Sequence, residues 1–432
     1  SFSVNEMETV SNSVCSFHLI CSRDLNLNLP KLNNISYVIA LDVNQQHTII
    51  EEKERNIIFH STKADHANQK KFKDLIIKYK KFSKSLSEFM NNIPPRLKSG
   101  KSDDSWLLVR MGWNIRKLGK RNMREFLRVI GLNIADELED NLTEDILKGL
   151  LAHEAILGSN LGPRSPGSVL TLLYKQAINE GLLFNSEKYN YHEFIPSLEK
   201  NCLNQGVEIR KNAGVKNIII DKHEAKGVIL DDEEKILADI IVSNADPKKT
   251  YFELLGTESL DTDFIRRAKN FRAKGNVAKL TLSLKEKPII QNIDNDKSNA
   301  RFIFAPDINY IEKAFNASKY SKYAENLCID FQKCENVIVA NLQYIPYLKN
   351  TTHDKEKIIQ QSLDLLKPFI TNLNVTNAEL ITPNDIENKY HVTGGHWHHG
   401  EFEIDQMLMM RPFYGSAQYK TPIKNLYICS AG

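Results

Sequence analysis

The sequence of 432 residues contains no long hydrophobic run. No stretch of about eighteen uncharged apolar residues occurs, so the sequence predicts no transmembrane helix. It also lacks an excess of charge of one sign, because 57 basic residues oppose 54 acidic residues and the formal net charge is +3. This near-balance gives no reason to expect a nucleic acid as a partner. No basic amphipathic anchor stands out, so the sequence gives membrane contact no support.

Cysteine is scarce, with six residues in the chain. They form no C-x-x-C pair and no cluster with the spacing of a zinc site. Unclustered cysteines in a chain of this length are typical of reduced thiols. The hydrophobic share of 41% and the charged share of 26% are those of an ordinary soluble protein. We therefore expect a cytoplasmic protein, or one of the mitochondrial matrix if the source is eukaryotic.

Self-contained catalytic signatures are absent as well. The sequence has no G-x-S-x-G, no H-E-x-x-H and no G-x-G-x-x-G motif. Residues 162–168 ("GPRSPGS") have the glycine spacing of a P-loop but lack its lysine, which argues against nucleotide binding there. No side chain can be named as catalytic from the sequence.

Histidines and carboxylates cluster in residues 394–405 ("GGHWHHGEFEID"). These residue types ligate metals. In an extended segment His396 and His398 would point one way and His399 the other, which breaks up a three-histidine ligand set. We therefore favour a loop whose imidazoles hydrogen-bond locally over a metal site, and we expect no metal.

Residues 1–60 are mixed in character, and residues 50–185 are expected to be mainly helical. Strands are expected at residues 37–41 and 48–50. Apolar residues then recur at three- and four-residue steps from Phe72 to Phe89, which predicts an amphipathic helix. Thr143 is expected to be the N-cap of a later helix.

The pattern changes at about residue 190. A helix at residues 192–204 is expected to end at Gly206, which suits a left-handed C-cap. Short Val- and Ile-rich runs predict strands at residues 207–211, 215–221, 225–231 and 235–243. Residues 240–242 are apolar on both faces, which is typical of a strand buried inside a sheet. A later strand at residues 276–284 alternates, with Lys279 among its polar positions.

Four stretches, in this order, resemble the phytoene-desaturase-type flavin oxidoreductases, within the amine-oxidase and GDI-like superfamily. Within that family the resemblance is to the branch of pyridine nucleotide-disulphide oxidoreductase domain-containing protein 2 and its bacterial relatives. The stretches are residues 150–174 ("LLAHEAILGSNLGPRSPGSVLTLLY"), 198–256, 301–321 and 393–432, the last ending in "LYICSAG". The resemblance runs over most of residues 100–432.

The resemblance implies FAD as cofactor and an apolar small molecule as substrate, with hydride taken from the substrate. Val215 matches a position whose backbone contacts the adenine end of FAD, and an ordinary strand valine is the alternative. Ala245 matches the small residue that ends a strand beside the cofactor. Ser430, Ala431 and Gly432 match the last flavin-contacting turn, where small residues let the backbone approach a ligand closely.

Arg411 matches a family arginine that could pair with phosphate or isoalloxazine oxygens, and a structural salt bridge is the alternative. The chain departs from the family in three places. It lacks the glycine-rich pyrophosphate loop, the Gly-Gly pair near residue 192 and the continuation after Gly432. We interpret both ends as truncated. The opposing interpretation is a non-catalytic GDI-like protein that binds lipidated or apolar partners.

The predicted fold class is α/β, a two-domain flavin oxidoreductase architecture with an incomplete dinucleotide-binding domain and an inserted substrate domain. The expected divisions are 1–49 as a remnant of the flavin domain, 50–185 as a helical insertion of the substrate domain, 186–250 as flavin domain, 251–415 as substrate domain with an antiparallel sheet, and 416–432 as a truncated flavin-binding strand. The sequence does not indicate an oligomeric state.

Overall fold

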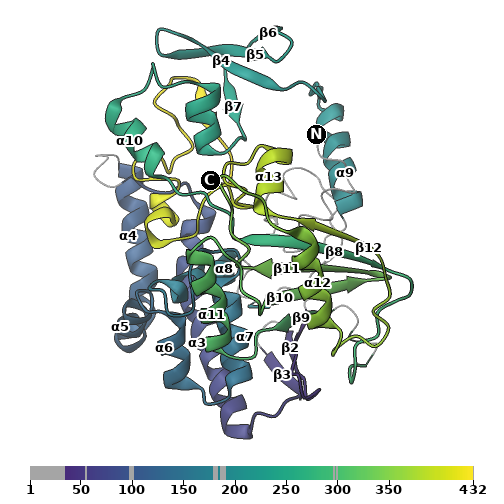
Figure 1. Ribbon diagram of the computed structural model, residues 1–432. Coiled ribbons are helices and arrows are strands. Elements are labelled where there is room, and N and C mark those ends of the chain that lie inside the picture. Colours follow the sequence, from purple (N-terminus) through teal and green to yellow (C-terminus); the bar gives the residue numbers. More distant parts are fainter. Residues whose placement is uncertain are drawn as a thin grey trace.

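The structure is a computed structural model, which describes residues 35–53, 56–96, 102–178, 183–184, 191–294, 297 and 300–431. Figure 1 shows three parts: a group of helices at the lower left, a large sheet at the lower right and a small sheet at the top. Predicted Gly432 lies outside the described residues.

The large sheet has eight strands in the order β12-β8-β11-β10-β9-β1-β2-β3. Adjacent strands of this sheet pair antiparallel, except for β1 and β9, which pair in parallel. The strands are β1 Ile35–Ala40, β2 Thr48–Lys53, β3 Asn56–Ser61, β8 Val277–Leu284, β9 Arg301–Phe304, β10 Cys328–Cys334, β11 Val337–Gln343 and β12 Val375–Ile381.

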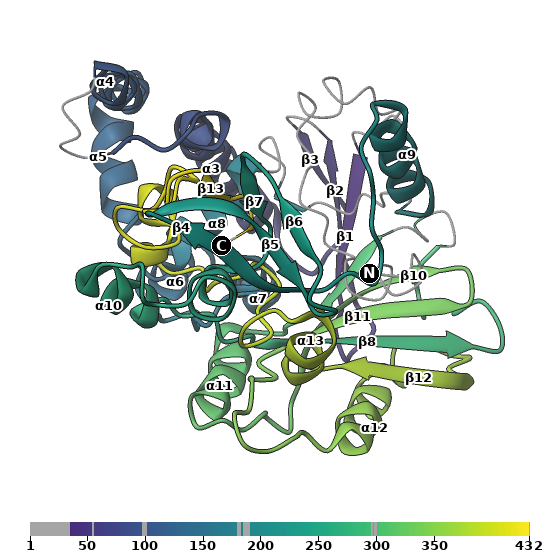
Figure 2. The ribbon, with the colours of Figure 1, turned by 90° about the horizontal axis from the view of Figure 1, so that it is seen from above.

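Alternation along the strands divides the sheet into two faces, because successive side chains of a strand point in opposite directions. In β8, Ala278, Leu280 and Leu282 enter one core, which also contains Ile358 and Leu366 of α12 (Lys355–Leu366). The other face of the sheet packs against the helical group through residues such as Val38 of β1. The sheet is therefore covered by helices on both sides, as Figure 2 shows from above.

The position of β1 corrects the expected division at residue 49. We assigned residues 1–49 to a remnant of the flavin domain, but β1 lies inside the large sheet, between β9 and β2. Val38 pairs with Arg301 on one side and with Ile50 on the other. Backbone hydrogen bonds to β9 attach this strand to the part of the sheet that residues 251–415 form, and its other edge pairs with β2. The expected strands at 37–41 and 48–50 themselves correspond to β1 and β2.

The helical group packs on one face of the large sheet. Its members are α3 His66–Asn91, α4 Ser102–Arg116, α5 Gly119–Val129, α6 Ile134–Asn141, α7 Asp145–Ile156 and α8 Ser168–Ile178. The predicted periodicity of α3 is confirmed from Phe72 to Leu86, whose side chains are buried, while the side chain of Phe89 lies outside the described ones. The predicted cap of α7 is wrong by one residue, because Glu144 is the N-cap and Thr143 instead bonds to Asn68 with its hydroxyl.

The small sheet and its neighbours complete the fold. Helix α9 (Tyr191–Asn204) is followed by Gly206 with a φ of 80°, as predicted. The three-stranded sheet consists of β4 Val215–Asp221, β5 Glu224–Leu230 and β6 Lys235–Leu237, and a separate parallel pair consists of β7 Ile241–Ser243 and β13 Leu426–Ile428. The remaining helices are α10 Thr262–Asn270, α11 Ile308–Lys319 and α13 Pro383–Tyr390. The short helical turns are η1 Lys249–Leu254, η3 Ile404–Gln406 and η4 Leu408–Met410.

Two strand predictions in this region are wrong. Residues 207–211 form no strand. The run 240–242 is not buried inside a sheet, because Ile240 and Val242 are both more than half exposed. Within the described part of the chain β7 pairs only with β13, so one edge and much of the surface of this two-stranded pair remain uncovered.

Two helical glycines allow a matched test of the packing between α7 and the sheet. A Cβ on Gly149 of α7 would lie 2.0 Å from the carbonyl oxygen of Ala305, whereas a Cβ on Gly112 of α4 would meet nothing within 4 Å. We expect Gly149→Ala to lower the free energy of unfolding by about 1–3 kcal/mol because the helix must move away from the strand end. Gly112→Ala should raise it by up to about 1 kcal/mol through helix propensity. Denaturant unfolding measures both, and equal effects of the two variants would contradict this packing.

Candidate functional site

An open crevice of about 440 Å³ lies at the end of strand β7. Its lining includes Val215 of β4, residues 242–246 at the end of β7, and His399. In open α/β sheets, ligands bind outside the carboxyl ends of parallel strands, and the volume lies within the usual range of small-molecule sites. The crevice is therefore the first candidate for a binding site.

The end of β13 lies beside this crevice. Tyr427 pairs with Val242 in parallel, and the amide of Cys429 donates to the carbonyl of Ser243 at 2.9 Å. The thiol of Cys429 also contacts Asn244 Oδ1 at 3.8 Å. The pairing thus places the turn after β13 next to the turn after β7, although the two segments lie far apart in the sequence.

The predicted site residues fall into two groups. Val215 and Ala245 line the same crevice. Ser430, which is buried, and Ala431, which is exposed, follow directly on the strand paired with β7, but neither belongs to the lining among the described residues. The structure therefore brings the crevice and the β13 turn side by side without showing both turns on one surface.

Asp246 fixes the turn after β7. Its carboxylate is buried and accepts bonds from the backbone amides of Lys248 at 2.9 Å, Lys249 at 3.1 Å and Thr393 at 2.9 Å. The first amides of η1 are thus occupied by a side chain. A helix start can bind an anion only through free amides, so this one is already satisfied from within the chain.

Arg411 acts as a clamp, in the sense that its guanidinium group binds backbone carbonyl groups of several loop segments. Its guanidinium donates from Nε to the carbonyl of Ala431 at 2.8 Å and from Nη2 to the carbonyl of His398 at 2.6 Å. Further bonds reach the carbonyls of Glu401 and Gln406. The salt bridge that we weighed as an alternative is wrong, since no carboxylate within the described residues pairs with this side chain. Burial lowers the pKa of Arg411 to about 10, so the clamp remains charged at neutral pH.

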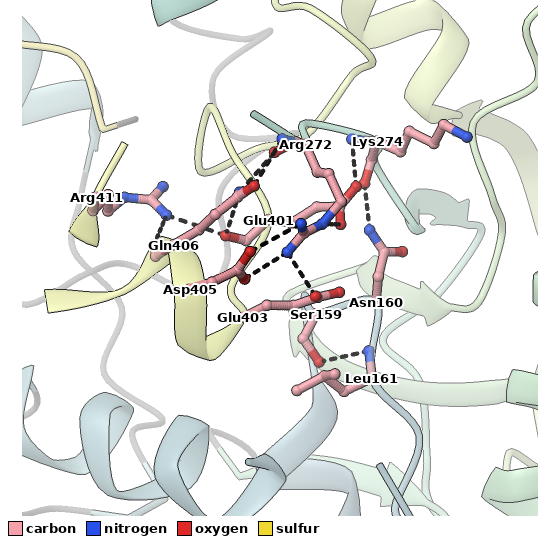
Figure 3. Close-up of polar contacts among 10 residues, drawn as sticks. All are labelled: Ser159, Asn160, Leu161, Arg272, Lys274, Glu401, Glu403, Asp405, Gln406 and Arg411. Carbon is pink, nitrogen blue, oxygen red and sulfur yellow. Dashed lines mark hydrogen bonds and ion pairs between the residues drawn. The ribbon is translucent and has the colours of Figure 1, made fainter. Parts of the chain in front are cut away.

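A second arginine holds the loop that follows the histidines, as Figure 3 shows. Arg272 forms ion pairs with Glu401 at 3.3 Å, Glu403 at 2.7 Å and Asp405 at 2.7 Å. The amide of Lys274 donates to Glu401 Oε1 at 3.0 Å. Hydrogen bonding to Asp405 and its neighbouring carboxylates raises the pKa of Arg272 above its usual value. The loop at residues 401–405 is therefore tied to the segment that leads into β8.

The same network reaches the helical group. The side-chain amide of Asn160 donates to the carbonyl of Lys274 at 2.7 Å (Figure 3). The amide of Gly158 donates to Gln343 Oε1 at 2.9 Å, and a Cβ on Gly158 would collide with the ring of Trp397. The loop after α7, the sheet and the histidine loop thus meet at one place.

The histidine loop is a series of turns rather than an extended segment, in line with the loop that the sequence favoured. Gly394 and Gly395 both have positive φ, and the amide of His399 donates to the carbonyl of His396 at 2.8 Å. Burial lowers the pKa of His396 to about 3 and holds that of His398 well below its usual value. Among the described residues no group of three His, Cys, Asp or Glu side chains could hold a metal ion.

The sequence did not indicate a row of buried polar side chains that crosses the large sheet on its helix-facing side. Lys279, Asn341 and Asp330 stand opposite one another on β8, β11 and β10. Arg301 donates to Asp330 at 2.8 Å and pairs with Glu154 of α7 at 2.6 Å. The alternating pattern of β8 was visible, but it could not tell a polar face in water from one covered by helices.

Lys279 is the member of this row whose charged group lacks a hydrogen-bond partner among the described residues. Its side chain is buried, and its ammonium group has no hydrogen-bond partner within the described residues. Burial lowers the pKa of Lys279 to about 7, and Asp330 opposes the shift. With a pKa of about 7, this lysine gains or loses its proton near neutral pH, whereas a lysine in water stays protonated there.

Known proteins resemble the chain in sequence. Pyridine nucleotide-disulfide oxidoreductase domain-containing protein 2 of Mus musculus is 24% identical over 354 residues, which cover 73% of this chain and 60% of the relative. The lycopene-forming phytoene desaturase of Paracoccus is 24% identical over 300 residues, which cover 65% of this chain and 56% of the relative. The chain is thus similar in sequence to oxidoreductases of the phytoene-desaturase type. No family model matches the sequence.

The fold has solved counterparts. A cofactor-binding variant of putrescine oxidase superposes with a TM-score of 0.55 and 9% identity, covering 95% of this chain and 79% of that structure. The similarity shows that this chain has the mixed α/β, two-domain fold of that structure, which agrees with the fold class predicted from the sequence. The chain spans about 60% of the length of the curated relatives it matches. No helix within the described ranges is both long and apolar enough to cross a membrane.

The pKa of Lys279 predicts a specific dependence of stability on pH. Between the folded pKa of about 7 and the unfolded value of 10.5, the unfolded chain binds a proton that the folded chain does not. Stability should therefore rise with pH across this window, by up to about 1.4 kcal/mol per pH unit. Lys279→Met, which keeps the stem and removes the amine, should flatten this part of the profile.

Denaturant unfolding at several pH values from 7 to 10 measures the slope for the natural chain and the variant. Lys357→Met, at an exposed position of α12, serves as control and should leave the slope unchanged. Parallel profiles for the natural chain and Lys279→Met would show that the Lys279 amine is not buried.

Proposed function

We propose that the protein is an FAD-dependent oxidoreductase that takes hydride from an apolar substrate. The observation that carries the proposal is the parallel pairing of β7 with β13, which sets two turns of small residues beside one crevice. A crevice at the ends of parallel strands suits a dinucleotide. The flavin would supply the redox chemistry, and the protein would supply binding, orientation and exclusion of water.

The crevice fits part of the cofactor. Val215 and Ala245 present backbone and small or apolar side chains to the crevice, and Ser430 and Ala431 follow on the neighbouring strand. Arg411 holds the carbonyl of Ala431, so the turn has a fixed position before any ligand arrives. Preorganised backbone lowers the cost of binding.

The pyrophosphate of FAD has no equivalent partner in the described residues. The sequence contains no G-x-G-x-x-G motif, and the first amides after β7 are occupied by Asp246. Phosphate binding in dinucleotide folds depends on such free amides. We therefore infer that the residues shown contribute the adenine-side wall and the last turn of the site but only a small share of the phosphate affinity.

An apolar substrate is supported by the names of the relatives. They include phytoene desaturase and 4,4'-diaponeurosporene oxygenase, and phytoene is a hydrocarbon. No side-chain triad of the kind that hydrolases use is visible in the sequence, which suits chemistry that a cofactor performs. We assign no catalytic side chain.

The reading frame upstream of Ser1 distinguishes this proposal from a non-catalytic binder of lipidated or apolar partners. A strand followed by G-x-G-x-x-G, with Asp or Glu about twenty residues later, would support the oxidoreductase. Protein expressed from the natural gene should then show a flavin absorption spectrum. A folded but colourless protein would contradict the proposal and favour the binder.

The 432-residue chain by itself should bind added FAD only weakly, because it lacks the phosphate-binding amides of the glycine-rich loop. Quenching of flavin fluorescence during titration measures the affinity, and gel filtration measures retention. Stoichiometric retention of FAD through gel filtration would show that the chain holds the phosphates by other groups.

A bulky residue in the crevice should compete with the cofactor. Ala245→Trp fills the space beside β7, and we expect it to reduce flavin binding by the natural-gene protein at least about tenfold, as the loss of one well-packed contact region does. Ala67→Trp, on the exposed first turn of α3, is the control and should bind flavin normally. Equal flavin content in both variants would place the cofactor elsewhere.

A further inference from the structure

His399 has a strained backbone conformation at the edge of the crevice. Its φ is 57°, in the left-handed region that residues with a side chain seldom adopt. The amide of His399 donates to the carbonyl of His396 at 2.8 Å, so a tight turn imposes this conformation. Backbone strain of this kind is concentrated at ligand-binding sites. Glycine would adopt the same conformation without strain, so the imidazole at this position needs another reason.

The imidazole of His399 lacks a hydrogen-bond partner. Neither of its ring nitrogens forms a hydrogen bond within the described residues, and Nδ1 is buried. The other two histidines of the loop are engaged within the chain. His396 Nδ1 accepts from the amide of His398 at 3.2 Å, and the ring of His398 lies 5.2 Å from that of Phe402. Because a bound partner sets the tautomer of a histidine, His399 is free to donate or to accept toward a ligand.

The side chain of His399 belongs to the wall of the crevice, together with Ala245 and Asp246. Other polar groups of this wall are already occupied. The carboxylate of Asp246 accepts three backbone amides. The hydroxyl groups of Ser243 and Thr250 share a hydrogen bond at 2.8 Å. His399 is thus a polar group of this wall that remains available to a ligand.

The charge around His399 favours an uncharged partner. Burial lowers the pKa of His399 below the usual histidine value, although the carboxylate of Asp246 opposes the shift. The imidazole is therefore neutral at neutral pH, with one N–H donor and one acceptor. A phosphate group is disfavoured here, because the nearby carboxylate repels it and a neutral imidazole does not offset that repulsion. A group that carries carbonyl oxygens and N–H groups is the better match.

Arg411 connects the histidine loop to the turn after β13. Its guanidinium group donates both to the carbonyl of Ala431 and to the carbonyl of His398, the residue before His399. The resemblance assigns Val215 to the adenine end of the cofactor and the turn after β13 to the flavin end. One side chain therefore ties His399 to the flavin end of the crevice.

We propose that the imidazole of His399 hydrogen-bonds the isoalloxazine ring of FAD and fixes the place of that ring in the crevice. This inference rests on the proposed function. The edge of the isoalloxazine carries carbonyl and N–H groups, which match the donor and the acceptor of a neutral imidazole. The contact supplies the partner that His399 lacks within the chain. The redox chemistry belongs to the flavin, and the role of His399 is to hold it in position.

Titration of the flavin-free natural-gene protein with FAD tests the contact. His399→Gly removes the imidazole and relieves the strain. We expect its dissociation constant for FAD to rise about fivefold, as the loss of one hydrogen bond between neutral groups does. The visible absorption bands of the bound flavin should also shift, because the isoalloxazine is the chromophore. His399→Asn keeps a donor and an acceptor on a side chain that tolerates left-handed backbone, so it should restore most of the affinity.

His223→Gly is the matched control. His223 also has a positive φ, of 61°, but it is exposed in the turn between β4 and β5 and does not belong to the lining of the crevice. This variant should match the natural protein in affinity and spectrum. Circular dichroism verifies that all three variants are folded.

Two results would overturn the inference alone. One is a yellow natural-gene protein whose His399→Gly variant has unchanged affinity and spectrum. The other is weaker binding with an unchanged spectrum, because His399 would then contact another part of the cofactor. A colourless natural-gene protein that binds no added FAD would instead overturn the proposed function together with this contact, so the two failures are distinguishable.

Discussion

The parallel pairing of β7 with β13 is the interaction on which the candidate site depends. It joins segments that lie far apart in the sequence, and only a few backbone bonds carry it. Around it, the polar contacts of Asp246 and Arg411 hold the two adjoining turns in place. The crevice therefore has its shape because these polar contacts, together with the apolar cluster that contains Leu426 and Ile428 of β13, determine where the turns lie.

The chain stabilises three of its arginine side chains in three different ways. Arg272 is neutralised by carboxylates, Arg411 is solvated by carbonyl oxygens, and Arg301 is paired with two buried acids. Lys279 has none of these arrangements, and its burial depresses its pKa instead. Removing a charge from water costs several kcal/mol unless partners replace the solvent, so each arrangement constrains the loops and strands that supply the partners.

Local pattern predicted much of the fold. The period of α3, the C-cap at Gly206 and the strands β4 and β5 follow from residues that determine structure by themselves. The predictions that were wrong depended on distant neighbours. Residues 240–242 have the composition of a buried strand, but whether they are buried depends on what covers them. The division at residue 49 was wrong because the pairing of β1 with β9 leaves no trace in either segment alone.

The candidate site shows the same contrast between what local sequence predicts and what distant contacts decide. Val215 and Ala245 were named through resemblance and share a crevice. The histidine segment was expected to be a loop and is one, but its turns depend on the positive φ of Gly394 and Gly395, which the sequence pattern does not specify. Arg411 was named as a possible partner of the cofactor, whereas the partners that the structure shows are backbone carbonyls, which no sequence pattern reveals.

The place of β1 also has a consequence for the order in which the chain acquires its structure. Strand β1 is synthesised early, yet one of its two neighbours, β9, is separated from it by the whole helical group and the small sheet. Until β9 emerges, the hairpin of β1 and β2 keeps an open edge, and closing the large loop between them carries an entropic cost. Contacts of such long sequence separation slow folding and leave strand edges exposed to other chains in the meantime, so this edge of β1 is protected only once residues 301–304 are in place.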